Sequence, residues 1–228
     1  MTRKFNSKTT IVTICLVVVI SVVTIYISFN NLDAIKKSNA PKVYNLNYSS
    51  DYEVNGDIEG LANSADFIVL GHYNKYIENW NMGENHEGEI YSFVVDQALM
   101  GSLKGEIEVS IPHSIYVSTE VDGKEYGNDV IVSNYHKPNL DKQYVLFLKK
   151  LQTRDSYGPS SVPFQIEIVG NTVELKYNEE IPSDIKTKNN DVIKINYEQI
   201  DLNGQDKVSR LTKNELFEQL NAVISNIK

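Results

Sequence analysis

The chain has 228 residues and a formal net charge of −8, and this charge is unevenly distributed. Residues 1–40 carry five basic and one acidic side chain, so they contribute +4 and residues 41–228 contribute −12. A segment this acidic repels phosphate backbones and anionic lipid headgroups, which argues against a nucleic-acid partner. The only cysteine is Cys15, so residues 41–228 contain no disulfide and no catalytic thiol.

Residues 11–29 predict a transmembrane helix. They read IVTICLVVVISVVTIYISF, without a charge, Pro or Gly. At 1.5 Å of rise per residue they reach about 28 Å, close to the hydrocarbon thickness of a bilayer. The basic residues that precede them favour a cytoplasmic location for residues 1–10 by the positive-inside rule. We therefore expect a single-pass protein of the cell membrane, anchored through residues 11–29, with its C-terminal domain extracytoplasmic.

A cleaved signal peptide is the alternative interpretation of this segment. Signal peptides have a shorter apolar core that ends near a small-x-small cleavage site. The small residues of 38–40 have that spacing, but they lie well past the apolar run and Pro41 follows them. We therefore prefer the interpretation that the segment is an uncleaved anchor.

The residues after the anchor predict a tether and then one β-rich domain, 58–228. Residues 30–57 are rich in Asn, Ser, Lys and Tyr and show no periodicity, which favours a tether. Asp57 precedes apolar residues at helical spacing, which predicts a short helix. Residues 78–89 are polar and contain glycine, so we expect a loop there. Strand-like patterns occur at 67–73, 90–99, 106–111, 130–132, 144–148, 164–168, 173–175 and 192–195.

Turns and a final helix complete the predicted elements. Asp122-Gly123 and Gly170-Asn171 are typical of hairpin turns. Thr212 and Glu215 form a capping box in front of an apolar stripe, which predicts a C-terminal amphipathic helix. The fold class is therefore mainly β with flanking helices, either a small antiparallel β-barrel or a sandwich.

Three blocks of sequence carry a resemblance to a known set of proteins: LANSADFIVLG at 61–71, the stretch 92–109 with its Gly-Ser-Leu-Lys-Gly turn, and DKQYVLFL at 141–148. Together they resemble uncharacterised membrane-anchored or secreted bacterial proteins. They are also similar to the OB-fold of the netrin and tissue-inhibitor-of-metalloproteinases domains. The resemblance implies an OB-like barrel and no catalytic residue, since the cysteines of the animal domains are absent.

A search for catalytic or metal-binding patterns gives no site. The four histidines are His72, His86, His113 and His136, and none has the spacing of a metal-binding motif. No nucleophile elbow or phosphate-binding glycine loop occurs. We therefore expect no cofactor and no metal.

Tyrosine is the most unusual residue in the composition, with 14 in the chain. Tyrosine offers a large contact area with a polar tip, so a ligand-binding surface is one interpretation. Tyrosine is also favoured in strands, so the alternative is that these residues simply fill a β-rich domain. The candidate surface comprises Tyr73, Tyr76, Trp80, His86 and Tyr91.

These features lead to one preferred function and two alternatives. The preferred function is a non-enzymatic, membrane-anchored extracytoplasmic module that binds a protein or glycan. One alternative is a surface hydrolase that uses carboxylates of residues 84–96. The other is an accessory or immunity-type membrane protein whose anchor contacts a partner.

Overall fold

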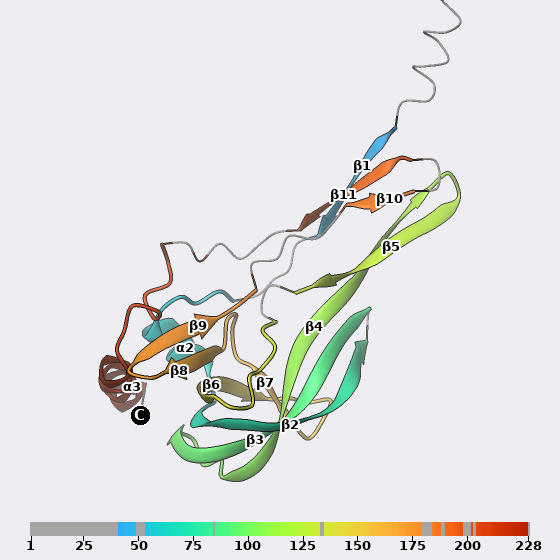
Figure 1. Ribbon diagram of the computed structural model, residues 1–228. Helices are drawn as coiled ribbons and strands as arrows, with labels where there is room; N and C mark the ends of the chain where they lie inside the picture. The colour runs from blue at the N-terminus through green and yellow to red at the C-terminus, as the bar shows by residue number, and fades with distance from the viewer. Residues whose placement is uncertain are drawn as a thin grey trace, which may run out of the picture.

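The computed structural model describes residues 41–48, 53–83, 85–132, 135–178, 184–187, 190–197, 202 and 204–227. In these residues the protein is mainly β with two helices, as the sequence predicts. Figure 1 shows a body that holds both helices and a narrower arm that projects from it. Residues 1–10 and the predicted transmembrane segment 11–29 lie outside the described residues. Among the residues that are described, no helix is long and apolar enough to span a bilayer.

The body is built from one large sheet and two helices. Its elements are α2 (Ile58–Ser64), β2 (Phe67–Gly83), β3 (His86–Met100), β4 (Gly105–Val121), β6 (Gln143–Lys150), β7 (Tyr157–Pro159), β8 (Gln165–Val169), β9 (Thr172–Lys176) and α3 (Lys213–Ile227). The strand order is β2-β3-β4-β7-β6-β8-β9, and β2 also pairs with β6. This second pairing makes the sheet curl back on itself.

The curled sheet is not a closed barrel, which corrects the expectation of a small antiparallel β-barrel. β4 and β7 meet, in parallel, at a single residue pair, Val109 and Tyr157. Because β7 has only three residues, it cannot continue the hydrogen bonds along the 17 residues of β4. The seam between β4 and β7 is where closure fails.

The inner face of the curl is packed with aromatic and branched side chains. Residues 144–148 of β6 are all fully buried, as the apolar run predicts. Tyr144, Leu146 and Leu148 face this inner core, and the two residues between them face the helices. The Tyr73 ring makes edge-on contacts with the rings of Tyr91, Phe93 and Tyr144, with centroids 5.0–5.6 Å apart. Such edge-to-face contacts add to the stabilisation that comes from burial.

The outer face of β6, β8 and β9 is covered by the two helices. Asp57 caps α2, since its Oδ1 accepts the Gly60 N–H at 2.9 Å. Thr212 and Glu215 form the predicted capping box, in which the Thr212 N–H donates to Glu215 Oε2 at 2.7 Å. The stripe of α3 then buries Leu216, Leu220 and Ile224 against this face. The two helices predicted for the β-rich domain are confirmed.

The arm contains β1 (Val43–Tyr48), β5 (Lys124–Ile131), β10 (Ile185–Lys186), β11 (Val192–Tyr197) and the distal part of β4. β1 pairs in parallel with β11, so two segments about 150 residues apart in the chain lie side by side. Branched side chains of the β4–β5 hairpin pack on this small sheet, with Ile195 buried between them. The range 30–57, predicted as a tether, therefore includes a paired strand. Its weak pattern has a physical reason, because Val43, Asn45 and Asn47 are exposed and Tyr44 and Leu46 on the other face are only half-buried.

One predicted hairpin turn is confirmed, and one predicted loop is corrected. Asp122 and Gly123 have φ values of 51° and 73° and connect β4 to β5, as predicted. The predicted loop at 78–89 is wrong, since residues 78–83 and 86–89 extend β2 and β3 into a long hairpin. The outer half of this hairpin is largely exposed, so it lacks the apolar alternation by which a half-buried strand is recognised.

Candidate ligand-binding surface

The five residues of the candidate surface all lie on the β2–β3 hairpin, but they do not share one exposed surface. Tyr73 and Tyr91 belong to the inner core of the curled sheet and are buried. The Tyr73 hydroxyl donates to Gln165 Oε1 at 2.8 Å. Burial raises the pKa of both tyrosine hydroxyls well above the usual value. These two residues hold the hairpin from beneath, and neither offers a face to a ligand.

Tyr76, Trp80 and His86 occupy the outer part of the hairpin, and we refer to them as the hairpin surface. Tyr76 is 45% exposed, and its hydroxyl donates to Asn79 Oδ1 at 2.8 Å. Its ring leans edge-on against Tyr91, with centroids 5.6 Å apart. Trp80 and His86 are half-buried and lie close to the turn. An exposed aromatic ring supported by a buried one is a fixed contact surface with little rotamer freedom to lose on binding.

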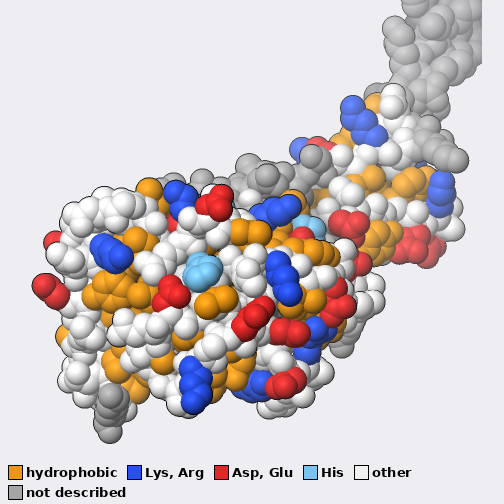
Figure 2. All heavy atoms as spheres, turned by 60° about the horizontal axis from the view of Figure 1, so that its bottom comes forward, with side chains coloured by type: hydrophobic (Ala, Val, Ile, Leu, Met, Phe, Trp, Pro, Cys, Tyr) orange, Lys and Arg blue, Asp and Glu red, His pale blue; other side chains and the backbone are white. Residues whose placement is uncertain are grey.

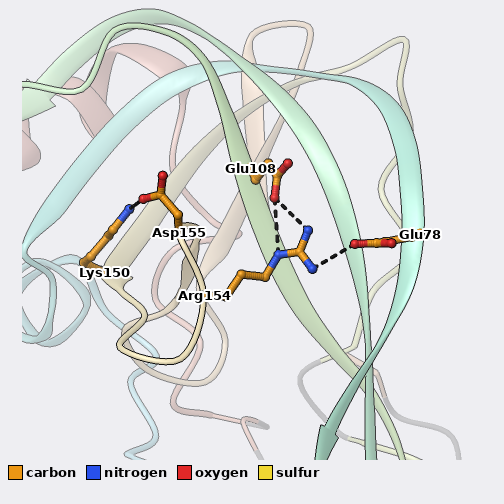
Figure 3. A network of polar contacts seen from close by, with 5 residues as sticks. All are labelled: Glu78, Glu108, Lys150, Arg154 and Asp155. Carbon is orange, nitrogen blue, oxygen red and sulfur yellow. Dashed lines mark hydrogen bonds and ion pairs between the residues drawn. The ribbon is translucent and has the colours of Figure 1, made fainter.

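Arg154 fastens the outer part of β2 to β4 (Figure 3). Its guanidinium donates to Glu108 Oε2 at 2.9 Å and lies 2.8 Å from Glu78 Oε1. The same guanidinium lies over the Trp80 ring, with Cζ 6.0 Å from the centroid. The two carboxylates raise the pKa of Arg154 above its usual value, so it stays charged. A planar fork of donors suits this bridging role better than an ammonium group.

A second network links the base of the hairpin to the segment that follows β5. Glu89 accepts hydrogen bonds from the Tyr91 hydroxyl at 2.7 Å and the Tyr135 hydroxyl at 2.9 Å. The Tyr135 ring in turn meets His113 edge-on at 4.4 Å. Burial, reinforced by the Glu89 carboxylate, raises the pKa of both hydroxyls. Glu89 therefore acts as a hydrogen-bond acceptor that joins two elements.

Of the carboxylates proposed for a hydrolase, those that the structure describes are not brought together, and Glu84 lies outside the described residues. Glu87 is exposed near the turn, Glu89 holds two tyrosines, and Asp96 lies far along β3. Asp96 Oδ1 is 3.6 Å from His72 Nδ1, and its Oδ2 accepts from Gln143 at 3.1 Å. In the described part of the chain, no three His, Cys, Asp or Glu side chains gather as metal ligands.

A hollow of about 530 Å³ opens at the end of the β2–β3 hairpin. It is lined by Asn81, Gly83, Asn85, His86, Glu87, Tyr116 and Asp129. Of these residues, the sequence singled out His86 for the candidate surface and Glu87 among the carboxylates of the hydrolase alternative. Tyr116 was noted as one of many tyrosines, and nothing in the sequence marked Asp129. The two face each other across β4 and β5, a pairing that the strand register alone creates.

Comparison with known proteins adds no relative. No family model matches the chain, and no curated protein or solved structure matches it either.

Proposed function

We propose that this chain is a single-pass, membrane-anchored binding module whose β-rich domain lies outside the cytoplasm. The observation that carries the binding role is the hairpin surface. There Tyr76 and Trp80 are held in place by a buried tyrosine beneath and an arginine bridge beside them. Rigid aromatic side chains with polar neighbours are the residue types enriched at recognition sites. The partner is a protein or a glycan.

The anchored arrangement is supported by the direction in which the chain enters the domain. Strand β1, the first described element, lies in the arm, while α3 and the C-terminus lie at the opposite side of the body (Figure 1). An anchor at residues 11–29 would therefore place the arm nearest the bilayer and present the body away from it. The apolar run and its basic flank supply the membrane part of this proposal.

An OB-like fold of the netrin type is part of the same proposal. Its support is the set of five strands β2, β3, β4, β6 and β7, whose pairings form a ring interrupted at the β4–β7 seam. OB-folds are five-stranded, partly open barrels that bind ligands through one face and its loops. This order of strand pairing does not depend on the cysteines that animal netrin domains contain.

The acidic surface restricts the class of partner. On the face shown in Figure 2, hydrophobic patches are separated by single charges, and acidic side chains gather on the side toward the arm. With −12 of formal charge in residues 41–228, the domain repels polyanions at low ionic strength. A neutral or cationic partner fits this surface.

The binding role is tested by sedimentation of the full-length protein, kept soluble in a mild detergent, with purified cell-envelope material. We expect wild-type protein to co-sediment and the double variant Tyr76→Ala, Trp80→Ala to lose at least about tenfold in affinity, which corresponds to 1.4 kcal/mol. Leu140→Ala is the matched control, because Leu140 is 43% exposed but lies outside the hairpin. Equal binding by all three proteins would refute the hairpin surface as the site.

The membrane topology is tested separately on intact cells that carry a tag at each end of the chain. We expect an added protease to remove the C-terminal tag and leave the N-terminal tag intact. Protection of both tags would contradict the extracytoplasmic location, and release of the protein without membrane disruption would contradict the anchor.

A further inference from the structure

The hollow at the end of the β2–β3 hairpin is a built concavity lined by residues of four strands, β2, β3, β4 and β5. The Asn85 carbonyl accepts the Tyr116 N–H at 2.8 Å, which fastens the hairpin turn to β4. Asn85 has a φ of 65° and Gly83 a φ of 84°, so both residues have left-handed backbone conformations. The Asn81 Oδ1 accepts the Gly83 N–H at 2.8 Å. These two hydrogen bonds hold Asn85 against β4 and Gly83 against Asn81 at the edge of the hollow.

Tyr116 forms an aromatic platform at the edge of this hollow. A Cβ at Gly127 would lie 2.3 Å from the Tyr116 hydroxyl and 2.4 Å from Cζ, so the end of the ring rests directly on the glycine backbone. The side chain nevertheless remains 38% exposed. One part of the ring is therefore packed on β5 while the rest is open to solvent. Gly127 is needed for this placement, since any larger residue would lift the ring.

The polar groups of the lining indicate which ligands fit. Asp129 and Glu87 supply carboxylate acceptors, while the Asn81 and Asn85 amides offer both donors and acceptors. Among the residues that the structure describes, neither lysine nor arginine lines the hollow, so anionic ligands gain no attraction from them. An ammonium ion donates hydrogen bonds but accepts none, so it can pair with the two carboxylates but not with the amide N–H groups. A hydroxyl group both donates and accepts, and a ring that carries several of them can satisfy the whole set.

We propose that this hollow binds a glycan, with one sugar ring stacked on Tyr116 and its hydroxyls bonded to Asp129, Glu87 and the two asparagines. The inference rests on the proposed binding function and names its ligand class. A volume of about 530 Å³ lies within the usual range for small-ligand sites, about 300–1,000 Å³. It accommodates a short stretch of a polysaccharide whose remaining units extend along the hairpin surface.

The test is a titration of the full-length protein with three neutral tetrasaccharides, built from glucose in α linkage, glucose in β linkage and N-acetylglucosamine. The protein is held in a detergent without a sugar headgroup, and binding is followed by calorimetry and by ligand-observed NMR. We expect at least one tetrasaccharide to bind. Tyr116→Ala should weaken that binding at least about tenfold, and Tyr116→Phe, which keeps the ring, by less than about threefold.

Two further variants separate the site from general damage to the fold. Gly127→Ala should weaken sugar binding by lifting the Tyr116 ring, while Leu140→Ala should leave it unchanged. Trilysine and inorganic phosphate serve as the cationic and anionic probes. Sugar binding that is absent, or that survives Tyr116→Ala unchanged, overturns the inference, and so does tighter binding of trilysine than of every sugar.

The envelope sedimentation assay keeps the two proposals distinguishable. If the envelope binds and Tyr76→Ala with Trp80→Ala abolishes this, while no tetrasaccharide binds, the glycan inference fails and the binding module stands. If wild-type protein binds neither envelope nor sugar, the proposed function itself fails.

Discussion

Replacing Tyr73 by Phe would remove a single hydroxyl from the inner core of the curled sheet. That hydroxyl donates to Gln165 Oε1 at 2.8 Å, and both side chains have 0% exposure. Gln165 Nε2 already has no hydrogen-bond partner among the described residues. Tyr73→Phe would therefore leave the whole amide of Gln165 unpaired in an apolar environment. A buried polar group without a partner costs about 1–3 kcal/mol.

The measurement is urea unfolding of the full-length protein, followed by the fluorescence of Trp80, the only tryptophan. With a slope of about 1–3 kcal/mol per molar urea, the expected loss moves the midpoint down by roughly 1 M. Gln165→Met alone should cost a similar amount, because it leaves the Tyr73 hydroxyl without its hydrogen-bond acceptor. The double variant, Tyr73→Phe with Gln165→Met, should lie within about 1 kcal/mol of wild type, since both polar groups are then gone.

Two outcomes of this comparison of single and double variants would contradict the coupling between Tyr73 and Gln165. If Tyr73→Phe unfolds at the wild-type urea concentration, the hydroxyl contributes nothing and the hydrogen bond does not hold the core. If the two single losses add in the double variant, each residue acts through packing alone and the pair is not coupled.

Three other predictions follow from single contacts. Gly71→Ala should destabilise the protein by about 3 kcal/mol, because its Cβ would lie 2.0 Å from the Val94 carbonyl oxygen, and a wild-type melting temperature would contradict this. Asp57→Ala should cost about 1 kcal/mol by removing the α2 cap, whereas Asp57→Asn should retain most of it, and equal losses in urea unfolding would exclude a capping role. Burial lowers the pKa of His136, so the unfolded chain takes up a proton near pH 6.5 that the folded protein binds only at lower pH. Stability should therefore fall as the pH drops below about 6.5. His136→Gln should reduce that fall between pH 7 and pH 5 in thermal melts. An unchanged pH dependence would show that His136 does not cause the loss of stability.

The core elements were predictable because each carries its own pattern. The apolar run of 144–148 is fully buried, and the stripe that follows Thr212 forms α3. Asp57 caps α2, and Asp122-Gly123 makes the predicted turn. In all of these, residues adjacent in the chain satisfy one another, so local spacing contains the information.

The candidate site was predictable only in part. The five candidate residues lie on one hairpin, but the sequence gave no means of separating Tyr73 and Tyr91, which face the core, from Tyr76, which faces solvent. Register shifts along β2, between residues 73 and 75 and again between 76 and 78, break the alternation from which facing is normally inferred. Arg154 escaped notice because its two acidic partners lie on different strands.

The sequence by itself determined the chemistry of this protein: an apolar N-terminal run, an acidic cysteine-free domain, and local patterns for most strands and both helices. Tertiary structure alone decided what those elements build. It paired β1 with β11, which are far apart in the chain, and left the barrel open at the β4–β7 seam. It also set Tyr116 opposite Asp129 beside the hairpin turn. The physical reason is that pairing between distant strands depends on register and shared burial, which no short stretch of sequence specifies.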